Sequence, residues 1–105
     1  MSAAAETSAT IVSAASLVGG GPGPPDPSRC SAAAIEALSR VAGAGFGMTS
    51  LALDLTSARL GPADISIRVH ANKRTLSIVF ASAEAWQGEQ LVFSAQGLFA
   101  RREAK

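Results

Sequence analysis

Only one stretch of this chain has the pattern of a helix, and that stretch is unusually apolar. It reads SAAAIEALSRVAGAG, residues 31–45. At 100° per residue the helix has an apolar face and, opposite to it, a face with the charged pair Glu36 and Arg40. The apolar face consists of Ala34, Leu38, Val41 and Gly45. A helix with so few polar positions predicts that other structure encloses it.

The sequence around this helix predicts strands and turns. Residues 1–9 are expected to form a disordered leader, and residues 19–29 hold four Gly and four Pro, which excludes a helix or a strand ladder. Ser28 or Ser31 is expected to cap the helix, and the glycines of residues 43–47 to end it. Alternating or β-branched patterns predict strands over residues 10–18, 50–58, 64–71, 75–85 and 90–100. The predicted order β-α-β-β-β-β indicates a single α+β domain over residues 10–105, with an antiparallel sheet of about five strands.

The composition excludes several classes of function. Nine basic and eight acidic residues give a net charge of +1, and with four Phe, one Trp and no Tyr we expect neither a nucleic-acid partner nor a membrane partner. The single cysteine, Cys30, cannot form an internal disulfide. One cysteine and one histidine do not predict a structural zinc site, so we expect no metal and no cofactor.

The hydrophobic content bears on localisation and assembly. No run of about 18 apolar residues is present, and the first ten residues, MSAAAETSAT, lack the basic segment of a signal peptide. We therefore expect a cytoplasmic protein. Apolar residues make up 48% of the chain and charged residues only 16%, which favours burial of some apolar surface against a partner.

Three segments resemble the 3-hydroxyacyl-ACP dehydratases, which have the hotdog fold. GPPDPSRCSAAAIEALSRVAG, residues 23–43, is similar to the family pattern HFPGHPxMPGxxxxEALAQAAG. RLGPADISIRV, residues 59–69, resembles the R-x-P-x-x-P-G-D turn and the strand after it, and residues 80–100 resemble the last hairpin. The strand segments also resemble hotdog acyl-CoA thioesterases, whereas the Glu-Ala-Leu helix favours the dehydratases. Together the segments cover roughly residues 20–100.

The resemblance implies a fold, a substrate class and site residues. It implies a curved antiparallel sheet around one central helix, and a homodimer or higher even oligomer that binds acyl thioesters of acyl carrier protein or coenzyme A. Glu36 would be the catalytic acid or base in a water-poor slot, with Arg40 beside it favouring the ionised form. The backbone N–H groups of Cys30, Ser31, Ala32 and Ala33 would polarise the thioester carbonyl. Fatty-acid or polyketide metabolism would be the setting.

The chain also departs from the dehydratase pattern. The family's catalytic histidine falls at Pro22 or Gly23, and neither can accept a proton. Two alternatives therefore stay open: an acyl-CoA thioesterase with Glu36 as the base, and a non-catalytic subunit that binds an acyl chain or completes a dimer. A thioesterase of the H-G-G-x-x-x-x-x-x-D kind would need its acid at Arg40. A further alternative is that Glu36 and Arg40 form a solvated i,i+4 pair on an ordinary helix surface.

Other chemistry-bearing residues have a structural and a functional interpretation. His70 is either an exposed strand residue or a replacement for the missing histidine, and Asp26 is either a solvated loop residue or a base. Cys30, close to a helix N-terminus, is a packing residue or a nucleophile. The basic clusters Lys73-Arg74 and Arg101-Arg102, with Lys105, are solvated charges or docking points for the carrier; we expect Lys73 and Arg74 to bind the carrier.

Overall fold

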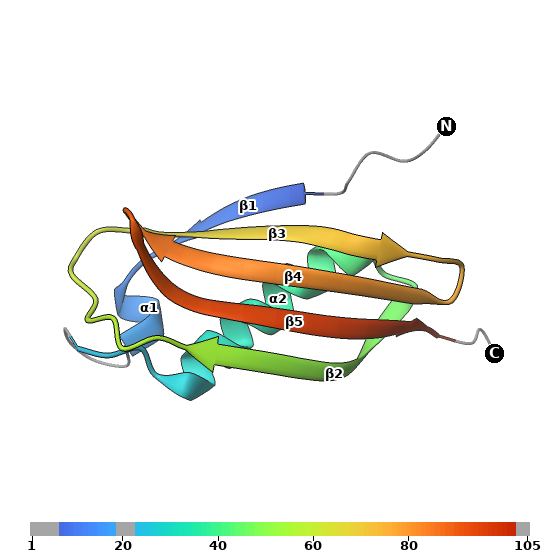
Figure 1. Ribbon diagram of the computed structural model, residues 1–105, viewed down its shortest axis with the longest axis horizontal. Coiled ribbons are helices and arrows are strands. Elements are labelled where there is room, and N and C mark those ends of the chain that lie inside the picture. Colours follow the sequence, from blue (N-terminus) through green and yellow to red (C-terminus); the bar gives the residue numbers. More distant parts are fainter. Residues whose placement is uncertain (1–6, 19–22, 103–105) are drawn as a thin grey trace.

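The computed structural model describes residues 7–18 and 23–102, and these form one antiparallel sheet with a long helix on one of its faces (Figure 1). The elements in chain order are β1 (Thr7–Val12), α1 (Ala15–Val18), α2 (Pro27–Ala42), β2 (Phe46–Leu55), β3 (Ile65–Arg74), β4 (Ile78–Gln87) and β5 (Gln90–Arg101). The strand order is β1-β3-β4-β5-β2, with every neighbouring pair antiparallel. The α+β hotdog fold expected from the sequence is confirmed, with five strands.

The two edges of the sheet come from the strands that flank the helix in sequence. β3, β4 and β5 follow one another through short turns, so they pair as neighbours and form the centre of the sheet. β1 precedes α2 and β2 follows it, and each joins an outer side of this central group. One side of β1 and one side of β2 therefore have no neighbouring strand within the described chain.

Helix α2 begins one turn earlier than the sequence predicted. Asp26 is its N-cap, and the Oδ2 atom of Asp26 accepts a hydrogen bond of 3.0 Å from the N–H of Arg29. Pro27 occupies the first helical position, where its missing N–H has no cost. The predicted caps Ser28 and Ser31 are thus wrong, because both lie inside the helix. The prediction that residues 43–47 end it is confirmed: Gly43 is the C-cap and adopts a φ of 102°, a region that favours glycine.

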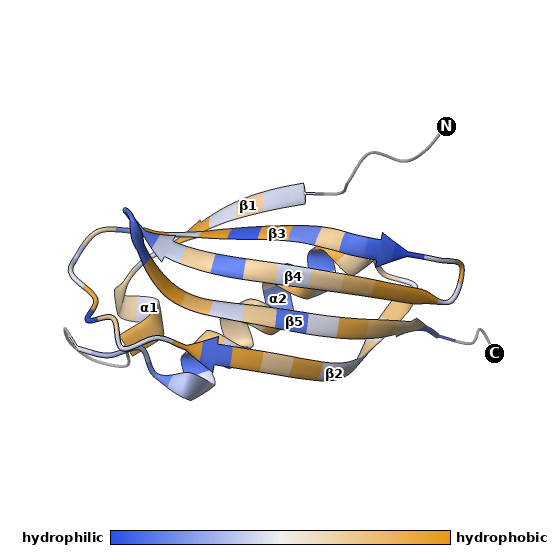
Figure 2. Ribbon diagram, viewed as in Figure 1, coloured by the Kyte–Doolittle hydropathy of each residue, from blue (hydrophilic) through white to orange (hydrophobic). Residues whose placement is uncertain are grey.

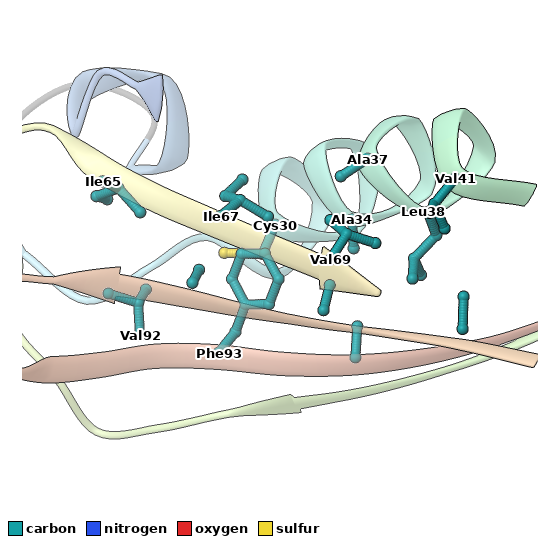
Figure 3. Packing of buried hydrophobic residues seen from close by; sticks show 14 of the residues in the cluster. Cys30, Ala34, Ala37, Leu38, Val41, Ile65, Ile67, Val69, Val92 and Phe93 are labelled. Atoms are coloured by element: carbon teal, nitrogen blue, oxygen red, sulfur yellow. The ribbon is translucent and has the colours of Figure 1, made fainter. Parts of the chain in front are cut away.

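Small side chains allow α2 to lie close to the sheet. The buried residues of β4 include Ala81, Ala83 and Ala85, and α2 faces the sheet with Ala34 and Ala37 among others. Larger apolar groups fill the rest of the core, including Leu38, Ile65, Ile67, Val69, Val92 and Phe93 (Figure 3). Phe99 is also part of this core. Helix and sheet are therefore in direct contact along the middle of the molecule, and the core between them is close-packed.

The N-terminal part differs from the sequence prediction. β1 begins at Thr7, so the expected disordered leader is wrong for residues 7–9; residues 1–6 lie outside the described residues. The strand predicted over residues 10–18 ends at Val12, and residues 15–18 form the short helix α1 instead. Leu17 of α1 is almost fully buried, which explains the turn away from the sheet: the segment covers the end of the core.

Candidate functional site

Glu36 and Arg40 form an ion pair on the outward face of α2. The Arg40 Nη2 atom lies 3.1 Å from Glu36 Oε2, and the side chains are 51% and 71% exposed respectively. The Nη1 atom of Arg40 also donates a hydrogen bond of 2.9 Å to Thr10 Oγ1, which connects α2 to β1. The expectation that Glu36 lies in a water-poor slot is therefore wrong for the single chain. The sheet covers only one side of α2 and leaves this side chain in solvent.

The first turns of α2 do not present free N–H groups to a ligand. The N–H of Cys30 donates to the Asp26 carbonyl at 2.9 Å. Ser31, Ala32 and Ala33 lie within an α-helix that begins at Pro27, so their N–H groups pair with carbonyls four residues earlier. The expected polarisation of a thioester carbonyl by these four N–H groups is wrong, because the helix uses them itself.

The thiol of Cys30 is a core group. Cys30 has no exposed surface, and its sulfur lies on the side of α2 that faces the sheet (Figure 3). Burial, with a smaller contribution from the negative charge of Asp26, raises the pKa of the Cys30 thiol to about 11. The thiol is therefore protonated at neutral pH, which does not suit a nucleophile.

An apolar groove of about 520 Å³ lies at the end of the sheet where α1 is found. Its lining comes from two segments that are far apart in sequence, namely the segment through α1 and the loop after β2. They contribute Ser13, Ala14, Ala15 and Val18 on one side and Leu60, Gly61 and Pro62 on the other. Among the described lining residues Ser13 supplies the only polar side chain, so these residues can hold an apolar group but include no acid or base.

His70 lies on the face of the sheet that α2 does not cover. Its register partner on β4 is Ser82, whose Oγ atom is 3.2 Å from His70 Nε2 and donates to Asn72 Oδ1 at 2.9 Å. A second hollow, also of about 520 Å³, includes His70 together with Arg68 and Glu84. The sheet separates His70 from Glu36, so the two residues do not meet within one chain. Asp26 does not meet Glu36 either, because it caps the start of α2, ten residues earlier in the chain.

The two predicted carrier-binding residues have different environments. Arg74 stabilises the C-terminal end of α2: its guanidinium donates to the carbonyls of Val41 and Ala42 at 2.7 and 3.1 Å. It also lies 5.6 Å from the centre of the Phe46 ring. Lys73 is an exposed residue next to the turn between β3 and β4. Arg74 thus has a structural role, and carrier binding at Lys73 remains a prediction.

Residues 7–18 and 23–102 contain neither a cluster of metal ligands nor a membrane-spanning helix. No group of three or more His, Cys, Asp or Glu side chains is arranged to hold a metal ion there. Within the same ranges, no helix has the length and hydrophobicity needed to cross a membrane.

The groove residues were missed by the sequence analysis because nothing in the chain pattern brings α1 next to the loop after β2. The Pro- and Gly-rich segment at residues 19–29 was the only hint of an unusual connection there.

Comparison with known proteins supports the fold. No protein-family model and no curated protein sequence matches this chain. Among solved structures, the chain is similar to a phenylacetic acid degradation-related protein from Ralstonia eutropha JMP134 that is described as a candidate thioesterase. The TM-score is 0.70 at 16% sequence identity, over 90% of this chain and 74% of that protein. At this identity the similarity establishes the shared hotdog fold.

Proposed function

We propose that this protein binds acyl thioesters of coenzyme A or acyl carrier protein as a hotdog homodimer, and that hydrolysis is the reaction its residues favour. The observation that carries the proposal is the apolar groove beside α1, which suits an acyl group because its lining is almost free of polar side chains. The shared fold with a candidate thioesterase is consistent with this substrate class.

Dehydration fits the residues less well than hydrolysis does. Loss of water from a 3-hydroxyacyl thioester needs one group that removes a proton and a second that protonates the leaving hydroxyl. Glu36 and His70 are the candidates, and they lie on opposite sides of the sheet. Hydrolysis needs only one group: Glu36 would take a proton from a water molecule that attacks the thioester carbonyl. The C–S bond would then break to give a carboxylic acid and a thiolate, and the thiolate would take the proton back from Glu36 and leave as a thiol.

A second copy of the chain could pair with this one along β2. β2 is a ten-residue edge strand, and its outer side is open for pairing. Ile35 on α2 and Leu55 on β2 are 41% and 38% exposed. Ile35 is about 140° around the helix from Arg40, which contacts β1, so Ile35 faces the β2 side. Pairing of two β2 strands would bury this apolar edge and bring the two α2 helices nearer to one another.

To test this proposal, the purified protein is incubated with saturated acyl and with 3-hydroxyacyl thioesters of coenzyme A and of acyl carrier protein. Free thiol and enoyl product are measured separately. We expect thiol release without enoyl formation, and a loss of at least about tenfold in Glu36→Gln. Glu84→Gln, which changes an exposed carboxylate on the other face of the sheet, is the matched control and should keep the activity. Enoyl formation would contradict the preference for hydrolysis, and an active Glu36→Gln would remove this residue from the mechanism.

The second candidate function is a non-catalytic acyl-binding subunit. The specific observation in its favour is the Glu36–Arg40 pair, since Arg40 stands where the H-G-G-x-x-x-x-x-x-D pattern has its acid and Glu36 is solvated. Titration with an acyl-CoA thioether, which cannot be hydrolysed, distinguishes the two. Binding that is lost in Ala15→Trp, a change that fills the groove, together with no thiol release from the thioesters, would favour the non-catalytic subunit.

A further inference from the structure

Basic side chains gather at one end of the sheet, where β3 turns into β4 and β5 ends. Lys73, Arg74, Arg101 and Arg102 are all exposed there. Two of them meet at one aromatic ring, since the guanidinium groups of Arg74 and Arg101 lie 5.6 and 5.8 Å from the centre of the Phe46 ring. The N–H of Arg101 also donates to the carbonyl of Ser77 in the β3–β4 turn.

The described acidic residues lie elsewhere. Asp26, Asp54, Asp64 and Glu89 are at the opposite end, near α1, while Glu36 and Glu84 are in the middle of their elements; no described acid lies at the β3–β4 end. Residues 103–105, which lie outside the described residues, contain one Glu and one Lys, whose charges cancel. The net charge of +1, which led us to expect no membrane partner, therefore conceals a strongly basic end.

An apolar surface borders these charges. We call it the hairpin patch; its members are Leu76, Ile78, Phe80, Leu98 and Ala100. Leu76 is at the tip of the β3–β4 turn and is 82% exposed, and Ile78 next to it is 43% exposed. Figure 2 shows the hydrophilic end of β3 beside the hydrophobic start of β4 at this turn. Phe80 pairs with Leu98, and Ile78 with Ala100, on the face that α2 leaves open.

The turn is built to hold Leu76 outward. The Oγ1 atom of Thr75 accepts hydrogen bonds from the N–H groups of Ser77 and Ile78, at 3.2 and 3.0 Å. The N–H of Thr75 donates to the Ile78 carbonyl at 2.8 Å, and the Arg101 guanidinium donates to the Leu76 carbonyl at 2.7 Å. The exposure of Leu76 is thus a property of a hydrogen-bonded turn, fixed on both sides of the residue.

We infer that the β3–β4 end is a docking surface for an anionic lipid membrane, with Leu76 and Ile78 inserting between headgroups and Lys73 and Arg102 contacting lipid phosphates. Arg74 and Arg101, whose guanidinium groups are bound to backbone carbonyls, add positive charge beside them. An anionic lipid surface attracts basic side chains, and a protruding apolar side chain is buried at the boundary between its headgroups and acyl chains. A folded acidic protein fits less well, because a convex hairpin tip offers little of the roughly 800 Å² that each partner contributes to a standard interface.

Docking of this end would leave the groove accessible. The molecule is 44 Å long, and the groove beside α1 is at the other end of the sheet from the β3–β4 turn (Figure 1). A membrane-bound copy would therefore hold the groove away from the lipid surface. The inference does not depend on the proposed thioester function, because the groove and Glu36 lie outside this surface; it competes only with the predicted carrier binding at Lys73.

The test is flotation of the full chain with phosphatidylcholine vesicles that contain or lack phosphatidylglycerol. We expect binding to the anionic vesicles only, and release at high salt because the attraction is screened. Leu76→Ser should weaken binding by about tenfold or more, since a buried leucine contributes that much to an apolar contact. Ile11→Ser, which changes an isoleucine on β1 that is 62% exposed, is the matched control and should bind like the unchanged protein.

A second pair of variants tests the charges. Lys73→Gln combined with Arg102→Gln should reduce binding to anionic vesicles, whereas Arg29→Gln combined with Arg59→Gln, at the other end, should not. Circular dichroism checks that each variant is folded. Absence of binding to anionic vesicles would overturn the inference, and so would an equal loss in the matched controls. Capture of apo acyl carrier protein without vesicle binding, or self-association that Leu76→Ser abolishes, would likewise assign the surface to another partner.

Discussion

Replacement of Gly97 by alanine tests how closely α2 packs against the sheet. Gly97 is on β5, and a Cβ atom at this position would lie 3.1 Å from Phe99 Cε1, 3.2 Å from Leu38 Cδ1 and 3.3 Å from Met48 Cε. Carbon atoms are in favourable contact at about 3.5 to 4.0 Å, so each neighbour would have to retreat by a few tenths of an ångström. Met48 can give way at its flexible end, but Leu38 and Phe99 are enclosed in the core.

Two opposing effects set the change in the free energy of unfolding. Overpacking of a close-packed core lowers it by about 1 to 3 kcal/mol, whereas the smaller conformational entropy of an unfolded chain without this glycine raises it by about 0.4 to 1 kcal/mol. We therefore expect Gly97→Ala to lower the free energy of unfolding by about 1 to 2 kcal/mol. Leu38→Ala alone should lower it by about 3 kcal/mol, because it leaves a cavity at a fully buried site. The double variant should lose at least about 1 kcal/mol less than the sum, since the new methyl group enters the space that Leu38 vacates.

Urea unfolding at one fixed protein concentration, followed by the fluorescence of Trp86 and by circular dichroism, measures all four members of this cycle. Gly97→Ala combined with Val92→Ala is the control. Val92 is five residues away along β5, roughly 16 Å, so these two changes should be additive. Additive losses for Gly97 and Leu38, or a stabilising Gly97→Ala, would refute the argument that the helix and sheet meet at this glycine.

Two further predictions concern stability and reactivity. Arg74→Gln should lower the free energy of unfolding by about 1 to 2 kcal/mol in the same urea assay, because the carbonyls of Val41 and Ala42 lose their donor. The control Lys73→Gln should change it by less than about 0.5 kcal/mol. Equal effects of the two variants would contradict the role of Arg74 at the C-terminal end of α2. Cys30 should resist thiol reagents at neutral pH until the protein unfolds. The pKa of this thiol is about 11 in the folded state and 9.0 for an unperturbed thiol, so the unfolded chain loses the proton at lower pH than the folded protein does. The free energy of unfolding should therefore be unaffected by this group below about pH 9 and should fall between about pH 9 and 11. Cys30→Ala should lack that fall in pH-dependent unfolding, and an unchanged profile would show that another group is responsible.

The periodicity of the sequence predicted most of the fold. Alternation of apolar residues located β2 to β5 within a few positions, and the resemblance supplied the hotdog arrangement, which local patterns cannot give. The N-cap of α2 was harder to predict than the strands. Asp26 lies in a run of prolines, and Ser28 or Ser31 was expected because serine is a preferred cap. The position of Pro27 as the first helical residue would have pointed to Asp26 instead. α1 was missed because four residues are too few to show a helical period.

The candidate site was predicted less well than the fold. The helical pattern by itself placed Glu36 opposite the apolar face, and that placement agrees with the exposure that the structure gives it. The resemblance to dehydratases led instead to a water-poor slot, which a single chain does not form. The groove could not be predicted at all, because it depends on the meeting of Ala14 and Leu60 from segments that are more than forty residues apart.

The alanines between α2 and β4 limit how a chain of this kind can change its ligand. Where α2 faces β4, mainly methyl groups separate the two layers, so any bulkier residue at Ala34 or Ala83 would wedge the layers apart, and trimming a methyl group there would open little space. Adaptation to larger or smaller molecules is therefore easier at the rim, in connecting segments whose length and composition can vary without repacking the interior.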